Sequence, residues 1–233
     1  MSIKEKLFGN VYDLIEKGPI TIVAFGDSVT FGWLDGDEAD FDTVYWNRLR
    51  KKINAVSHQI NVNVINAGIG GTTAAMGVKR LESQALCHNP DCIIICFGLN
   101  DVHGDINEYV NALDEIFARC KERCDQVIFM TPNMMNTYVA PDVAPELREF
   151  AAKTAEMQNG GKMDAFVDAG ISSAQRAGVT VCDCYGKWKE LAKTEDVTQL
   201  LVNRVNHPTR EMHELFAEEL FKIILLKDGY PFF

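Results

Sequence analysis

Five short apolar runs, separated by longer amphipathic segments, constrain the fold of this chain more than any other feature of its sequence. The runs cover residues 20–25, 62–66, 92–97, 126–131 and 179–182. The middle run, Cys92-Ile93-Ile94-Ile95-Cys96-Phe97, is apolar at every position, which is typical of a central parallel strand buried on both faces. Regular alternation of such strands with helices predicts an α/β fold, in which helices cover both faces of a five-stranded parallel sheet.

The segments between the runs have the pattern of helices. We expect helices over residues 42–56, 73–84, 106–123, 187–193 and 209–226, and a long one within 145–177. Thr209, directly after Pro208, is the expected N-cap of the last helix. The chain has 233 residues and no linker-like stretch, which predicts a single domain over residues 1–233.

Charge and composition exclude several classes of partner. The chain carries 23 Lys and Arg against 33 Asp and Glu, a net charge of −10, so phosphate backbones and anionic membranes would repel it. Its first residues lack the apolar stretch of a signal peptide, and no apolar run is long enough to cross a bilayer, so we expect a cytoplasmic protein. The seven cysteines include no C-x-x-C pair and no metal-ligand spacing, which predicts reduced thiols and no metal site.

Polar or glycine-rich residues follow several of the predicted strands. Gly26-Asp27-Ser28 follows the first, a glycine-rich stretch over 67–73 the second, and Asn100 the third, while His207 precedes the last helix. Ligand sites of open parallel sheets lie beyond the carboxyl ends of the strands. The sequence therefore predicts that these residues meet at one edge of the sheet.

Together these residues could catalyse acyl transfer. A serine hydroxyl becomes nucleophilic when a base accepts its proton, and histidine is the usual base near neutral pH, which predicts Ser28 as nucleophile and His207 as base. The oxyanion formed by attack on an ester needs preorganised donors, for which the backbone N–H groups of Ser28 and Gly71 and the side-chain amide of Asn100 are available. We expect a small-molecule ester as substrate and no cofactor.

Four stretches, residues 26–28, 66–71, 98–101 and 206–208, resemble the four sequence blocks of the SGNH, or GDSL-type, hydrolases and occur in that family's order. The family has a flavodoxin-like three-layer α/β/α sandwich and includes esterases, lipases, thioesterases and carbohydrate deacetylases. The resemblance implies the same roles for Ser28, Gly71, Asn100 and His207. A carbohydrate deacetylase is favoured over a lipase because the sequence shows no continuous apolar lid helix.

One position departs from the family pattern. The family usually carries an aspartate three residues before the histidine, where this chain has Arg204, which cannot accept a hydrogen bond. The favoured replacement is a backbone carbonyl in residues 203–206, or the amide oxygen of Asn203, which would leave a Ser–His dyad. Asp183, after the fifth strand, is a second possible partner for His207, and lost activity is a third interpretation.

Other interpretations of these stretches remain open. Residues 26–28 alone could be a strand-ending turn with a helix-capping serine, and the glycines of 68–71 invite a dinucleotide site, although the G-x-G-x-x-G spacing is incomplete. A catalytically silent domain that binds a glycan or a partner protein is a further alternative, supported by Arg204. A thioesterase or an acyltransferase would use the same machinery.

Several other residues could shape the site. Phe31, Trp33 and the pair Tyr45-Trp46 could wall a pocket or belong to the core, and His103 could line the cleft or face water. The segment from 133 to 161 could form a flap over the substrate or a simple surface excursion. The remaining histidines, His58, His88 and His213, fit exposed positions.

Overall fold

The computed structural model describes residues 3–225 and contains one sheet of five parallel strands in the order β2-β1-β3-β4-β5. All four strand pairings are parallel, which confirms the predicted α/β class and three-layer architecture. Each strand coincides with one predicted apolar run, to within two residues at either end. The strands are β1 (Ile20–Gly26), β2 (Val62–Gly68), β3 (Cys92–Cys96), β4 (Gln126–Met130) and β5 (Thr180–Cys182).

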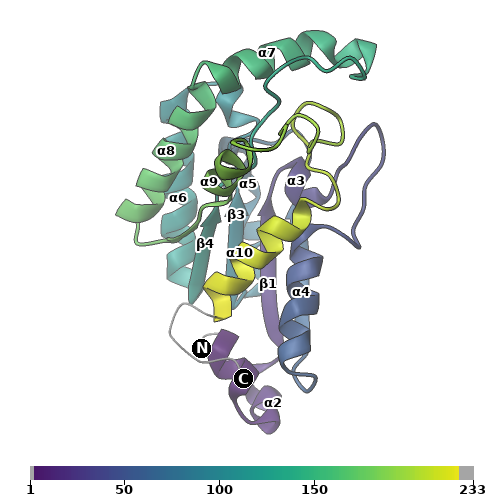
Figure 1. Ribbon diagram of the computed structural model, residues 1–233. Helices are drawn as coiled ribbons and strands as arrows, with labels where there is room; N and C mark the ends of the chain where they lie inside the picture. The colour runs from purple at the N-terminus through teal and green to yellow at the C-terminus, as the bar shows by residue number, and fades with distance from the viewer. Residues whose placement is uncertain (1–2, 226–233) are drawn as a thin grey trace.

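Helices cover both faces of the sheet. In Figure 1, α4 and α10 lie in front of the sheet and α5 and α6 behind it; α4 packs against α10, and α6 against both α5 and α8. The α-helices are α1 (Ile3–Phe8), α2 (Leu14–Lys17), α3 (Ser28–Phe31), α4 (Tyr45–Val56), α5 (Ala74–Gln84), α6 (Ile106–Arg123), α7 (Arg148–Asn159), α8 (Lys162–Arg176), α9 (Cys184–Leu191) and α10 (His213–Leu225). Short 3-10 turns are η1 (Val11–Asp13), η2 (Leu86–His88), η3 (Asp101–His103) and η4 (Pro145–Leu147).

Some predicted helix boundaries were wrong. The long helical stretch divides into α7 and α8 at Gly160 and Gly161, because Gly161 adopts a left-handed φ of +77° that a continuous helix excludes. The last helix begins at His213 rather than at Thr209, whose carbonyl accepts from Met212 N in a turn. The predicted end of that helix, Leu226, lies outside the described residues.

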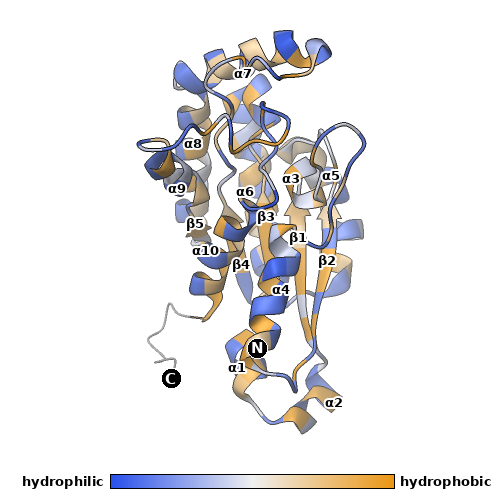
Figure 2. Cartoon of the chain, turned by 45° about the vertical axis from the view of Figure 1, so that its right-hand side comes forward, coloured by the Kyte–Doolittle hydropathy of each residue, from blue (hydrophilic) through white to orange (hydrophobic). Residues whose placement is uncertain are grey.

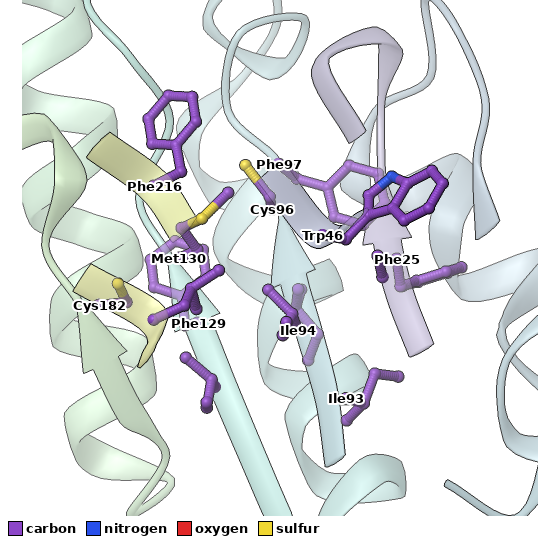
Figure 3. Packing of buried hydrophobic residues seen from close by; sticks show 14 of the residues in the cluster. Phe25, Trp46, Ile93, Ile94, Cys96, Phe97, Phe129, Met130, Cys182 and Phe216 are labelled. Atoms are coloured by element: carbon purple, nitrogen blue, oxygen red, sulfur yellow. The ribbon is translucent and has the colours of Figure 1, made fainter. Parts of the chain in front are cut away.

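The core lies between the sheet and its two helical layers. All five residues of β3 are buried, as expected for the central strand of a parallel sheet. Figure 2 shows hydrophobic residues along β1 and β3 and hydrophilic residues on the outward side of α4. Figure 3 shows buried hydrophobic side chains from three neighbouring strands, among them Phe25 of β1, Ile94 of β3 and Phe129 of β4. Among the described residues, no helix combines the length and apolar character needed to cross a membrane.

Candidate active site

An open cleft of about 550 Å³ lies at the carboxyl edge of the sheet. Ser28 begins α3 directly after β1, Gly71 lies in the loop after β2, Asn100 follows β3 and His207 lies before α10. All four of these residues line the same cleft. The structure thus brings together every site residue that the sequence predicted.

Ser28 and His207 are in direct hydrogen-bond contact. Nε2 of His207 lies 2.9 Å from Oγ of Ser28, and Nδ1 lies 2.7 Å from the backbone carbonyl oxygen of Leu34. A carbonyl oxygen can only accept, so Nδ1 must carry the proton in the neutral ring. Nε2 is therefore the acceptor that faces the serine hydroxyl, which is the tautomer that a general base requires.

The acceptor for Nδ1 is a backbone carbonyl, as favoured from the sequence, but it comes from an unexpected loop. It belongs to Leu34, in the connection between α3 and α4, and not to residues 203–206. The amide oxygen of Asn203 is unavailable for this role, because it accepts the backbone N–H groups of Val205, Asn206 and His207, each at 3.0 Å. Asn203 instead fixes the turn that presents His207.

Neither Arg204 nor Asp183 contacts the histidine. Arg204 turns away from the cleft, and its Nε donates to Oδ2 of Asp142 at 2.9 Å. Asp183 is the N-cap of α9, where its Oδ1 accepts from Gly186 N at 2.9 Å and from the hydroxyl of Thr131 at 3.2 Å. The suggestion that Asp183 replaces the usual aspartate is therefore wrong.

The environment of His207 favours the neutral imidazole. Burial lowers the pKa of His207 below its ordinary value, while the Leu34 carbonyl and the nearby Asp35 carboxylate partly offset this effect. Asp35 is exposed and follows Leu34 directly in the chain. At neutral pH His207 is thus in the form that can accept a proton from Ser28.

Three hydrogen-bond donors lie around the serine. Within the described part of the chain, no acceptor contacts the backbone N–H of Ser28 or that of Gly71. Gly71 has a left-handed φ of +72°, which glycine adopts without strain. Nδ2 of Asn100 donates one proton to the carbonyl of Thr72 at 3.1 Å, which leaves its second proton for a ligand in the cleft.

Two buried carboxyl groups hold the loops that carry these donors. Oδ1 of Asp27 accepts from Val29 N at 3.0 Å at the start of α3, and Oδ1 of Asp101 accepts from Ala74 N at 2.8 Å at the start of α5. Burial raises the pKa of Asp27 to about 7 and that of Asp101 to about 6. In both residues Oδ2 is buried without a hydrogen-bond partner.

A buried arginine beneath the cleft escaped the sequence analysis. Arg80 of α5 donates to the carbonyl of Ala67 at 2.6 Å and to that of Gly26 at 2.7 Å, and its guanidinium lies over the Phe25 ring at 4.4 Å. It therefore connects the ends of β1 and β2, which carry Ser28 and the Gly71 loop. The available signal was its spacing on α5, since Arg80 shares the inward face with Ala74 and Gly77.

The aromatic residues near the serine divide between cleft and core. Phe31 and Trp33 line the cleft with ring centroids 5.5 Å apart. Tyr45 is fully buried, and Trp46 donates from its indole to the carbonyl of Thr30. Of these four residues, only Phe31 and Trp33 line the cleft and can contact a ligand.

The segment from 133 to 161 contributes to the cleft through Leu147 and Phe150. His103 does not line the cleft but stacks on Phe150, with ring centroids 5.3 Å apart.

His213 was expected to be exposed, and this prediction was wrong. It is fully buried on α10, where its Nδ1 accepts from Tyr45 N at 3.2 Å, and burial lowers its pKa to about 3.

Known sequences match this chain over most or part of its length. The sequence model of the GDSL-like Lipase/Acylhydrolase family matches residues 24–215. The acetylxylan esterase of Geobacillus stearothermophilus is 23% identical over 184 residues, which cover 74% of this chain and 76% of that protein. The uncharacterized lipoprotein YqeF of Bacillus subtilis (strain 168) is 31% identical over 87 residues, which cover 36% of this chain and 33% of that protein.

Solved structures share the fold. Axe2, an acetylxylan esterase from Geobacillus stearothermophilus, has a TM-score of 0.69 at 21% identity, covering 91% of this chain and 95% of that chain. LAE5, an alpha/beta hydrolase enzyme from the metagenome of Lake Arreo, Spain, has a TM-score of 0.66 at 23% identity, covering 86% and 93%. Because the family match spans most of its residues, the chain belongs to the GDSL-like lipase/acylhydrolase family and is a carboxylic ester hydrolase.

Proposed function

We propose that the protein cleaves small carboxylic esters through an acyl-enzyme intermediate, with Ser28 as nucleophile and His207 as general base. The observation that carries this proposal is the continuous contact from Ser28 Oγ through His207 to the Leu34 carbonyl, at 2.9 and 2.7 Å. A serine with an accepting imidazole nitrogen and a partner that fixes the ring is the arrangement that nucleophilic acyl transfer requires.

In the first half-reaction, Oγ of Ser28 bonds to the ester carbonyl carbon while Nε2 of His207 takes its proton. Negative charge then develops on the carbonyl oxygen, where the backbone N–H groups of Ser28 and Gly71 and the amide of Asn100 stabilise it. The carbon–oxygen bond to the alcohol breaks, and the imidazolium returns the proton to the leaving alcohol.

In the second half-reaction, water attacks the acyl group held on Ser28. His207 removes a proton from that water, and the same three donors stabilise the second oxyanion. The imidazolium then protonates Oγ as the acid leaves, so the enzyme returns to its starting state. No step needs a group that this chain lacks.

We favour an acetylated carbohydrate, or a similar polar alcohol, as the leaving group. The cleft combines the aromatic rings of Phe31, Trp33 and Phe150 with polar side chains such as Asn203 and Asn206. Sugars present both apolar C–H faces and hydroxyl groups, which such a mixed surface can bind. The relative that aligns over about three quarters of both chains is an acetylxylan esterase.

We also propose a cytoplasmic location, which the seven unpaired cysteines support.

The proposal is tested with Ser28→Ala and His207→Ala. Both variants should lose nearly all turnover of p-nitrophenyl acetate, and Ser28→Ala should also lose labelling by a serine-directed phosphonate. Undiminished turnover in either variant would contradict the assignment. Comparing esters from acetyl to octanoyl, and then acetylated xylo-oligosaccharides, tests the substrate class. Faster cleavage of octanoyl than of acetyl esters would contradict a deacetylase.

A further inference from the structure

The carbonyl that contacts His207 lies in a short hairpin-like loop, which we define as the Leu34 loop, residues 32–43. Backbone hydrogen bonds join Leu34 N to Glu38 O and Asp40 N to Gly32 O, both at 2.9 Å. The indole N–H of Trp33 donates to the carbonyl of Gly36 at 2.6 Å. These bonds give the loop its internal shape, but they do not determine where it lies relative to His207.

Arg210 joins this loop to the segment that carries the histidine. It lies three residues after His207, and its Nε donates to Oδ2 of Asp40 at 2.7 Å while its Nη2 donates to Glu38. The carbonyl of Arg210 in turn accepts from Arg48 of α4 at 3.1 Å, which fixes its backbone. Figure 1 shows the loop after α3 beside the segment before α10, above the sheet.

We propose that Arg210 is a positioning residue for the base: by holding Glu38 and Asp40, it keeps the Leu34 carbonyl within hydrogen-bond distance of His207 Nδ1. This inference rests on the proposed function. An aspartate partner attracts an imidazolium by its own charge, whereas a carbonyl offers only a dipole whose effect depends on placement. A chain that uses a loop carbonyl in this role therefore needs that loop to be fixed.

The ion pairs have the geometry that such a role needs. One guanidinium contacts two carboxylates, and the side chain of Asp40 is only 18% exposed. Although partial burial alone would raise it, the pKa of Asp40 lies well below its ordinary value because Arg210 and Thr43 donate to the carboxylate. Asp40 is therefore ionised at neutral pH, where its ion pair with Arg210 can hold the loop.

The direction in which the pKa of His207 changes distinguishes a charge effect from a displaced loop. Asp35 of the loop raises the pKa of His207, and on the neighbouring His213 of α10 the charges of Arg48 and Asp40 act in opposite directions. Removing the Arg210 cation without moving the loop would raise the pKa of His207, because Asp40 and Glu38 would lose their counter-charge. Losing the Leu34 carbonyl would instead lower that pKa, because this acceptor stabilises the imidazolium.

The experiment compares Arg210→Met with Arg176→Met. Arg176 is an exposed arginine of α8 that pairs with Asp114 and does not contact the Leu34 loop. We expect Arg210→Met to lower kcat for p-nitrophenyl acetate about tenfold with KM changed less than twofold, because a displaced base affects the transition state more than substrate binding. The acidic limb of its kcat/KM profile should move to lower pH. Arg210→Lys should recover part of the lost kcat, and Arg176→Met should match the wild type.

Three results would overturn the inference. These are an unchanged kcat in Arg210→Met, an acidic limb that stays in place or moves to higher pH, and an equal loss of kcat in Arg176→Met. Thermal unfolding of each variant separates a folding defect from a catalytic one, and the Arg210→Lys variant keeps the test informative if the methionine variant is unstable. If Ser28→Ala is inactive while Arg210→Met behaves as wild type, only this inference fails and the proposed function stands.

Discussion

Replacing Asp27 by asparagine should stabilise the protein at neutral pH, although Asp27 directly precedes the proposed nucleophile. The carboxyl is fully buried, its Oδ2 has no hydrogen-bond partner, and burial raises its pKa from 3.8 to about 7. An acid whose pKa is higher in the folded state favours folding at low pH. That contribution is lost as the pH rises from the unfolded pKa to the folded pKa.

The magnitude follows from the width of this pH window. Between pH 5 and pH 7 the unfolded carboxyl is ionised while the folded one still holds most of its proton, which costs about 1.4 kcal/mol per pH unit, or roughly 2 to 3 kcal/mol in total. Asparagine has no such titration, and its side-chain oxygen can still accept from Val29 N. The stability of Asp27→Asn relative to the wild type should therefore increase by this amount between the two pH values.

Urea unfolding of both proteins at pH 5 and pH 7 measures the difference. A matched control is Asp105→Asn, which replaces the N-cap of α6. Asp105 is exposed, and the backbone N–H groups of Glu108 and Asn107 lower its pKa, so its titration lies below this window. The control should change stability equally at both pH values. If Asp27→Asn also shows the same stability difference from wild type at pH 5 and pH 7, the assigned burial cost is wrong.

Three further predictions concern the site and the loops beneath it. Asn100→Ala should lower kcat about 100- to 1000-fold with little change in KM, because it removes one oxyanion donor; steady-state kinetics that show less than a fivefold loss would exclude that role. The acidic limb of the wild-type kcat/KM profile should have its midpoint below 6.5, because burial lowers the pKa of His207 and only the neutral ring accepts a proton; a midpoint above 6.5 would contradict this. Gly68→Ala should destabilise the fold by about 2 kcal/mol or more in denaturant unfolding, since its Cβ would lie 2.2 Å from the backbone nitrogen of Phe31. Gly71→Ala, whose Cβ meets nothing within 4 Å, should lose only about 1 kcal/mol from its left-handed φ; an equal loss in both variants would refute the steric argument.

The sheet was predictable because its signal is local. Each strand is a short apolar run, and a parallel sheet buried on both faces leaves few polar positions to obscure it. Helix ends were harder to predict, because tertiary contacts decide them. Thr209 has the sequence of an N-cap, but the chain makes an extra turn there before α10 begins at His213. The break between α7 and α8 had a visible signal in Gly160-Gly161, which the amphipathic pattern of the long segment outweighed.

The four predicted site residues lie together because each follows a strand or precedes a helix at one edge of the sheet. The groups that hold them were less visible in the sequence. Arg80 is an arginine on a helix, and one-dimensional patterns place such residues on the surface. Its burial becomes understandable only when the strand ends are adjacent, because the carbonyls of Gly26 and Ala67 then need donors. The need for these donors arises from the pairing of strands that lie far apart in the sequence, so a local sequence pattern cannot reveal it.

The partner of His207 shows this limit most clearly, because any residue can supply a backbone carbonyl. What Leu34 contributes is the control of the tautomer, since its oxygen forces the proton onto Nδ1. In a serine protease, loss of that control costs about 10⁴ in kcat even when the geometry is intact, so the tautomer accounts for much of what a buried aspartate provides. A carbonyl can retain this contribution without a negative charge. In the proposed mechanism, the base therefore has a lower pKa and stays neutral further into the acidic range than a histidine paired with a carboxylate.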